Sequence, residues 1–296
     1  MRPFLGRLVG GRTKRRPQRF GRTSGCDVEC DVADDSDRDL RVARLVDLPE
    51  VAHEQFASPP LKAMLGQVRF PPILKIADPA SVAPFQNAIA ADFPTLAQEQ
   101  QVQILLGPAG GGTGTQKLWR FTSTDSAWSV LLGTDTLTIE AEWTQYTEYS
   151  AWRVRFEHVW QAALEYLGPA GVLYQGLRYI DHLERDLPGP EWATWINPDL
   201  LGAIRLSRFA DSLEHALTDL RFRTHDGVLS FKHGIVALGP NNAPGYLLDF
   251  DCFTQSAPNG IDSDSMLARF DGFHEIIWRL FRWSLTDEAI QHFREA

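Results

Sequence analysis

Two aspartates in the segment LLDFD are the strongest candidates for chemistry in this chain. Asp249 and Asp251 lie two residues apart in a predicted strand over residues 246–254, so their side chains share one face at a spacing of about 7 Å. Carboxylate oxygens placed in this way can bind Mg²⁺, and Asp181 or Glu140 could supply a third oxygen. The pattern therefore raises the hypothesis of a metal-dependent phosphoesterase or nuclease.

Basic side chains on the same face favour a different use of the two aspartates. Strand alternation places five basic residues at outward positions of neighbouring strands, namely Arg120, Arg178, Arg221, Arg223 and Lys232. Carboxylates among these cations are expected to form ion pairs, and ion pairs on an open sheet add little stability. Such a face is better explained as a recognition surface. We therefore assign no catalytic residue, metal ligand or cofactor, and the candidate binding residues are Arg120, Arg178, Arg221, Asp249 and Asp251.

Other motifs that often carry chemistry are incomplete. The segment 107–115, GPAGGGTGT, lacks the lysine of a phosphate-binding loop, and we expect it to be a flexible surface loop. No GxSxG serine motif occurs, and neither His-Glu step, at 53–54 or 274–275, continues to the second histidine of a zinc protease. We expect His158 to be solvated, and His274 to be half-buried with a hydrogen bond to a backbone carbonyl.

The strand that carries Arg178 belongs to the stretch that organises the rest of the chain. Apolar residues recur every three or four positions over residues 149–167, which predicts a helix with one buried face. Gly168-Pro169 ends this helix, and alternation over residues 172–183 predicts a strand. The residues expected on the buried face of the helix are Tyr149, Trp152, Phe156, Trp160, Ala163 and Leu167.

Similar elements precede and follow this stretch. Alternating patterns predict strands near residues 61–70, 117–124, 127–143, 217–223, 228–238 and 246–254, and helical patterns occupy residues 78–94, 192–206 and 264–283. Strands with one apolar and one polar face are typical of an antiparallel sheet that is covered on one side. We therefore expect an α+β fold with a mainly antiparallel sheet of about seven or eight strands and helices packed on one face. The order of elements is compatible with two loosely duplicated halves, residues 58–187 and 188–296.

Charge divides the chain into two parts. Residues 1–24 contain eight basic residues and no acidic one, whereas the rest contains all 38 acidic residues and 21 basic ones. An acidic body repels phosphate backbones, which argues against non-specific nucleic-acid binding by the folded part. Residues 1–50 are first basic and then acidic with little periodicity, so we expect a disordered leader. Residues 51–296 are expected to form a single α+β domain.

The remaining composition favours a cytoplasmic protein. Three cysteines, Cys26, Cys30 and Cys252, make an odd and sparse set that is typical of unpaired thiols in a reducing compartment. No run of about 18 apolar residues occurs, so no membrane span is predicted. The sequence does not indicate an oligomeric state.

Five segments, in order, resemble a sporadically distributed bacterial family of unknown function. They are PPLKAMLGQVRFPP, the helix ending in DFP, GLRYIDHL, LLDFD and FHEIIWRLFRWSLTDEAI, within residues 58–292. The resemblance implies no catalytic residues, and the patchy distribution of the family suggests accessory genes, such as defence or toxin-type modules. The leading hypothesis is a non-enzymatic protein that binds a protein partner through its charged sheet face.

Overall fold

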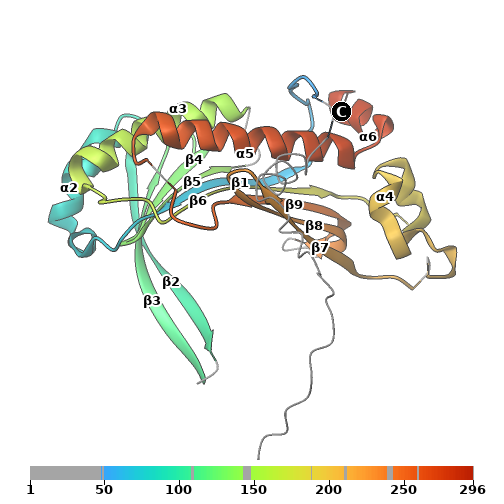
Figure 1. Ribbon diagram of the computed structural model, residues 1–296, viewed down its shortest axis with the longest axis horizontal. Helices are drawn as coiled ribbons and strands as arrows, with labels where there is room; N and C mark the ends of the chain where they lie inside the picture. Colours follow the sequence, from blue (N-terminus) through green and yellow to red (C-terminus); the bar gives the residue numbers. More distant parts are fainter. Residues whose placement is uncertain are drawn as a thin grey trace, which may run out of the picture.

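The computed structural model describes residues 48, 50–107, 110–142, 148–187, 189–209, 212–238, 243–258 and 260–295. Except for Leu48 and Glu50, the predicted leader lies outside the described residues, and so does Trp143 at the end of a predicted strand. The described part of the chain forms one large sheet with helices packed around it (Figure 1).

The nine described strands form a single antiparallel sheet in the order β2-β3-β4-β5-β1-β6-β9-β8-β7. The predicted antiparallel α+β fold is thereby confirmed, with a slightly larger number of strands than the seven or eight expected. The strands are β1 (Leu61–Arg69), β2 (Thr95–Gly107), β3 (Gly110–Thr122), β4 (Trp128–Leu132), β5 (Thr136–Glu142), β6 (Tyr174–Leu183), β7 (Ala216–Thr224), β8 (Gly227–Leu238) and β9 (Ala243–Phe253).

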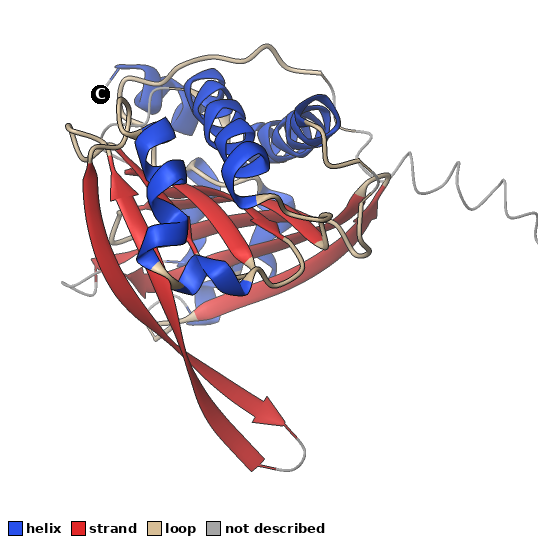
Figure 2. Cartoon of the chain, turned by 90° about the vertical axis from the view of Figure 1, so that its left-hand side faces the viewer, coloured by secondary structure: helices blue, strands red, loops and turns tan. Residues whose placement is uncertain are grey.

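Strand β2 and the first part of β3 are the elements that the sequence did not predict. They form a hairpin that projects beyond the sheet (Figures 1 and 2), with Val102 opposite Thr115 and Gly107 opposite Gly110. The expectation of a flexible surface loop over residues 107–115 is therefore wrong for its described residues. Glycine and glutamine have a weak preference for strands, but pairing with a neighbouring strand overrides that preference.

The helices lie mainly on one side of the sheet. Helices α2 (Pro79–Ile89), α3 (Tyr149–Ala162), α5 (Ser263–Ser284) and α6 (Asp287–Glu295) occupy this side, and the short α4 (Pro198–Leu201) lies at the end of the sheet (Figure 1). The stripe predicted over residues 149–167 is buried except for the half-buried Tyr149, and its last two members, Ala163 and Leu167, follow the end of α3. Trp152 and Phe156 pack edge-on against Phe270 of α5. A methyl group at Gly66 of β1 would overlap the ring of Trp152, so this close packing requires glycine.

The order of strands reveals an internal repeat. β1 and β6 pair at the centre; β5, β4, β3 and β2 follow outward from β1, and β9, β8 and β7 follow outward from β6. Each half also closes with a long helix, α3 or α5, that packs on the sheet. The repeat therefore divides the chain before Tyr174, whereas the halves considered from the sequence meet at residue 188. Among the described residues of the second half, β2 has no counterpart.

A segment that precedes β1, residues 50–58, packs across α5 and α6. His53 stacks between His274 and Trp278, with 5.1 Å between ring centroids on each side. Phe56 contacts the rings of Trp278, Phe281 and Phe293. The backbone takes part as well, because Nε1 of Trp278 donates to the carbonyl of Val51 over 3.1 Å. We call residues 50–58 the strap.

Candidate binding surface

We call the face of the sheet opposite α3 and α5 the free face. Strand pairing aligns one row of its residues across six neighbouring strands. In order from β7 to β5, this row contains Arg221, Ser230, Asp251, Arg178, Leu65 and Glu140. Three of the five candidate binding residues thus lie in one line, and Asp249 lies two positions along β9 from Asp251.

At the centre of the free face, Arg178 and Asp249 of neighbouring strands form a bidentate ion pair. Arg178 of β6 donates from Nε to Oδ1 of Asp249 and from Nη2 to Oδ2, each over 2.8 Å. The Asp249 side chain retains only 8% of its accessible surface. Its hydrogen bonds raise the pKa of the Arg178 guanidinium. The arginine therefore neutralises a carboxylate that would otherwise be buried without a partner.

Asp251 completes this cluster. It lies opposite Arg178 on β6 and opposite Ser230 on β8, while Lys232 lies opposite Asp249. Burial raises the pKa of the Asp251 carboxyl, and the charge of Arg178 acts in the opposite direction. The two aspartates are therefore set between basic side chains of β6 and β8, which is the arrangement expected from the alternation of charges.

The structure does not assemble the metal site considered from the sequence. Both oxygens of Asp249 accept hydrogen bonds from Arg178, and alternation along β6 places Asp181 on the helix-covered face with Tyr179. Glu140 accepts from Arg120 instead. Among the described residues, no group of three His, Cys, Asp or Glu side chains is arranged to hold a metal ion.

Arg120 belongs to a second cluster, on the other half of the sheet. Its Nε donates to Oε1 of Glu99 over 2.6 Å, and its Nη1 donates to Oε2 of Glu140 over 3.1 Å. These two hydrogen bonds raise the pKa of Arg120, although burial lowers it. The structure therefore separates Arg120 from Arg178, because β4, β5 and β1 lie between their strands.

Arg221 lies over an aromatic pair that the sequence analysis missed. Its guanidinium carbon is 5.4 Å from the ring centroid of Phe253, and Phe253 stacks on Tyr174 at 5.9 Å. Burial raises the pKa of the Tyr174 hydroxyl. The only signal in the sequence is strand parity, which places both rings at outward positions of β6 and β9. Apolar rings at such positions are easily mistaken for core.

The two histidines singled out in the sequence have defined surroundings. Nδ1 of His158 lies 2.9 Å from Oδ2 of Asp92 at the surface. His274 stacks on Tyr149 at 4.0 Å, and its Nδ1 lies 3.3 Å from the hydroxyl of Tyr179 rather than near the predicted backbone carbonyl. Burial, together with the charge of His53, lowers the pKa of His274 to about 3. His274 is therefore a neutral packing residue at physiological pH.

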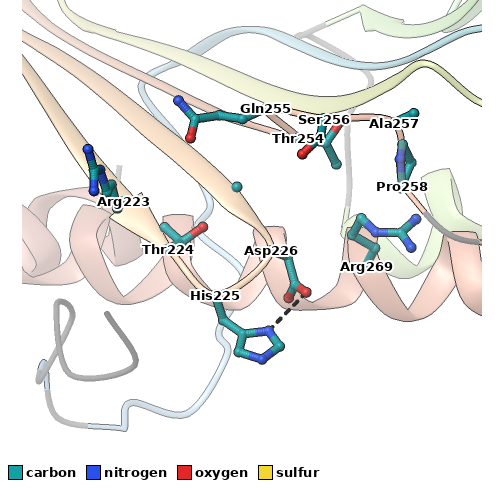
Figure 3. A pocket seen from close by; sticks show the side chains of 11 residues that line it. Arg223, Thr224, His225, Asp226, Thr254, Gln255, Ser256, Ala257, Pro258 and Arg269 are labelled. Atoms are coloured by element: carbon teal, nitrogen blue, oxygen red, sulfur yellow. Dashed lines mark hydrogen bonds and ion pairs between the residues drawn. The ribbon is translucent and has the colours of Figure 1, made fainter. Parts of the chain in front are cut away.

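An open hollow of about 390 Å³ lies where the turn between β7 and β8 approaches α5 (Figure 3). Arg223 and Arg269 stand on opposite sides of it, and Asp226 lies between them, 3.0 Å from Nδ1 of His225. Oγ1 of Thr224 is buried there without a hydrogen-bond partner in the described part of the chain. None of the five candidate binding residues lines this hollow.

Comparison with known proteins does not identify the chain. No protein-family model matches it, and a search of curated proteins finds no match. The resemblance to the sporadic bacterial family therefore stays a prediction. None of the helices in the described ranges combines the length and the apolar character that a membrane crossing requires.

Proposed function

We propose that this protein is a non-enzymatic binding protein that holds a protein partner on its free face. The observation that carries the proposal is the grouping around Arg178: a part-buried ion pair with Asp249, flanked by the exposed Arg221 and the aromatic pair of Phe253 and Tyr174. Arginine and aromatic side chains are enriched in protein interfaces, because they supply contact area and directional hydrogen bonds together.

The chemistry of the face favours a protein over a nucleic acid. Arg221 and Arg178 alternate with Asp251 and Glu140 along one row, and Asp249 lies opposite Lys232 in the next alternate row, so the face offers both signs of charge at short range. A phosphate backbone needs a continuous basic surface and would meet these carboxylates. A protein partner can match mixed charges with charges of its own, and such matching gives specificity.

A metal-dependent phosphoesterase or nuclease that uses Asp249 and Asp251 is the rival function. Arg178 already occupies the two oxygens of Asp249 that a cation would need. Calorimetric titration of the protein with Mg²⁺ and with Mn²⁺ separates the two functions. We expect no saturable heat. Saturable binding that disappears in Asp249→Asn would favour the enzyme.

The cellular setting is part of the proposal. Cys252 is an unpaired, buried thiol, and burial raises its pKa, so it is chemically inert and consistent with a cytoplasmic location. The resemblance to a bacterial family of accessory genes suggests that the partner belongs to a defence or toxin-type system. Genes adjacent to this one are the first candidates for the partner.

Charge reversal at Arg221 tests the proposed surface. The tagged full chain is used to capture proteins from its native host, side by side with Arg221→Glu and the control Arg205→Glu. Arg205 is exposed on a short turn near α4 and makes no ion pair among the described residues. We expect at least one protein to be retained by the wild type and by Arg205→Glu, and to be lost with Arg221→Glu. Identical captures by all three proteins would contradict the proposal.

A further inference from the structure

Strand β7 is an open edge of the sheet. It pairs with β8 along its whole length, from Ala216 opposite Ile235 to Thr224 opposite Gly227. No other backbone hydrogen bond reaches residues 216–224 within the described part of the chain. Alternate residues of an edge strand direct their N–H and C=O groups away from their one neighbour, so these groups of β7 have no backbone partner among the described residues.

The internal repeat shows what is missing beside β7. β7 occupies the position in the second half that β3 occupies in the first, and β3 is covered by the thirteen residues of β2. The second half has no strand equivalent to β2 among the described residues. The fold therefore leaves an open position for one more strand next to β7.

The side chains of β7 are arranged in a self-complementary way. Asp219 and Arg221 are exposed on the free face, and neither makes an ion pair with another described residue. Leu220, between them, points to the helix-covered side, where it packs against the core together with Phe222. We propose that β7 pairs antiparallel with β7 of a second copy of this chain, with the twofold axis midway between the Leu220 residues of the two copies.

The charges of Asp219 and Arg221 favour the register centred on Leu220 over the neighbouring registers. Residues opposed in an antiparallel pair share one face, so two identical strands related by a twofold axis must oppose one residue to its own copy, with the axis between them. Centring on Leu220 opposes Asp219 to the partner's Arg221, and this happens twice by symmetry. Centring on Asp219 or on Arg221 would instead oppose two like charges at the axis, which is destabilising. Leu220 is also the midpoint of the nine residues of β7, so the whole strand is paired.

The dimer would join two sheets into one continuous sheet, with both free faces on the same side. The inference does not rest on the proposed function, because its evidence is the edge of β7 and the register of Asp219 and Arg221. Arg221 also flanks the Arg178 grouping, so dimerisation is measured on the isolated chain, with no partner protein present. A single strand-to-strand junction buries less surface than most stable interfaces, so we expect a weak dimer with a dissociation constant on the order of micromolar.

Charge-swapped variants of the full chain test the register by sedimentation equilibrium over a range of concentrations. Asp219→Arg and Arg221→Asp each create two like-charged pairs, and each should weaken dimerisation by about tenfold or more. The double variant Asp219→Arg/Arg221→Asp restores opposite charges and should dimerise like the wild type. An equimolar mixture of the two single variants should form a heterodimer, because every opposed pair is then Arg with Asp.

Arg223→Asp is the matched control. Position 223 is on the same face of the same strand, but in this register it opposes the partner's Leu217, so dimerisation should change little. A second measurement uses the wild type alone. Hydrogen exchange of the backbone amides in residues 216–224 should slow as the protein concentration rises. A wild type that stays monomeric up to about 100 μM, the weak limit for such an interface, would overturn the proposal. So would a dimer that neither single variant weakens, or that the double variant fails to restore.

Discussion

At the scale of single residues, Asp181 lies in surroundings that are unfavourable for its charge. It is only 5% exposed, on the face of β6 that the helices cover. No hydrogen bond or ion pair compensates it among the described residues. Burial, and to a smaller extent the charge of Asp249, raises the pKa of its carboxyl to about 8. The folded protein therefore holds Asp181 in its neutral form at physiological pH.

This raised pKa makes stability depend on pH. In the unfolded chain an aspartate has a pKa of about 4. Between about pH 4 and pH 8 the unfolded state has lost the proton while the folded state keeps it, so rising pH favours unfolding. Below pH 4 both states are protonated and the penalty vanishes. Asp181→Asn removes the titration, and it should raise the free energy of unfolding by a few kcal/mol, as an order of magnitude, at pH 8.

Denaturant unfolding at several pH values measures this difference. The gain from Asp181→Asn should shrink steadily as the pH falls from about 8 and disappear near pH 4. Asp186→Asn is the control, because Asp186 follows the same strand but is exposed. Its effect on stability should be small at every pH. A gain from Asp181→Asn that is the same at pH 4 and pH 8 would show that the carboxyl is not held neutral.

At the scale of elements, α3 joins the helix layer to the centre of the sheet. Trp160 is fully buried, stacks on Phe156 at 6.3 Å, and donates from Nε1 to the carbonyl of Ile261 over 3.0 Å. The same helix exposes Val154, with 64% of its surface accessible. Trp160 and Val154 therefore provide a buried and an exposed position on the same helix for comparison.

We expect Trp160→Ala to lower the free energy of unfolding by about 3–5 kcal/mol, because removal of the large side chain leaves a cavity and the part-buried carbonyl of Ile261 loses its donor. Val154→Ala should change stability by less than about 0.5 kcal/mol. Thermal and denaturant unfolding of the two variants provide the comparison. Equal melting temperatures of the two variants would contradict the packing of α3 in the core.

At the scale of the whole molecule, the strap links the start of the described chain to its C-terminal helices. Glu54 accepts two hydrogen bonds from Arg294 of α6, at 2.7 and 3.1 Å, and the amide of Ser58 donates to the carbonyl of Phe293. Phe56 fills the space between α5 and α6. These contacts span more than 200 positions in the sequence, so they form only when both ends of the chain are folded together.

The strap should therefore contribute to global stability. Phe56→Ala is expected to lower the free energy of unfolding by about 1–3 kcal/mol, less than for a fully buried phenylalanine because the ring is only half-buried. Gln55→Ala, at the exposed neighbouring position, should have an effect within about 0.5 kcal/mol. Denaturant unfolding of both variants checks this expectation. A negligible effect of Phe56→Ala would mean that the strap is not part of the cooperative fold.

The sequence by itself determined the local elements and the sides on which their residues lie. Periodicity identified α3, α5 and most strands, and strand parity placed Arg178, Asp249 and Asp251 on one polar face. Both signals are local, because a helix repeats every 3.6 residues and a strand every two, whatever the element packs against. Strand β2 and the first part of β3 gave no such signal, because their glycine and polar residues lack the alternation of a half-buried strand.

Tertiary structure decided which of these residues meet. The alternation of side chains along a strand could not show that Arg178 binds Asp249 while Arg120 binds Glu99 and Glu140. These contacts depend on the order of strands in the sheet, which is a property of the whole chain. Nor could the alternation show that β1 and β6 lie at the centre of a repeat, or that β7 is left at an open edge. These features depend on contacts between residues far apart in sequence, which compete through the packing of the complete fold and leave no mark on any single segment.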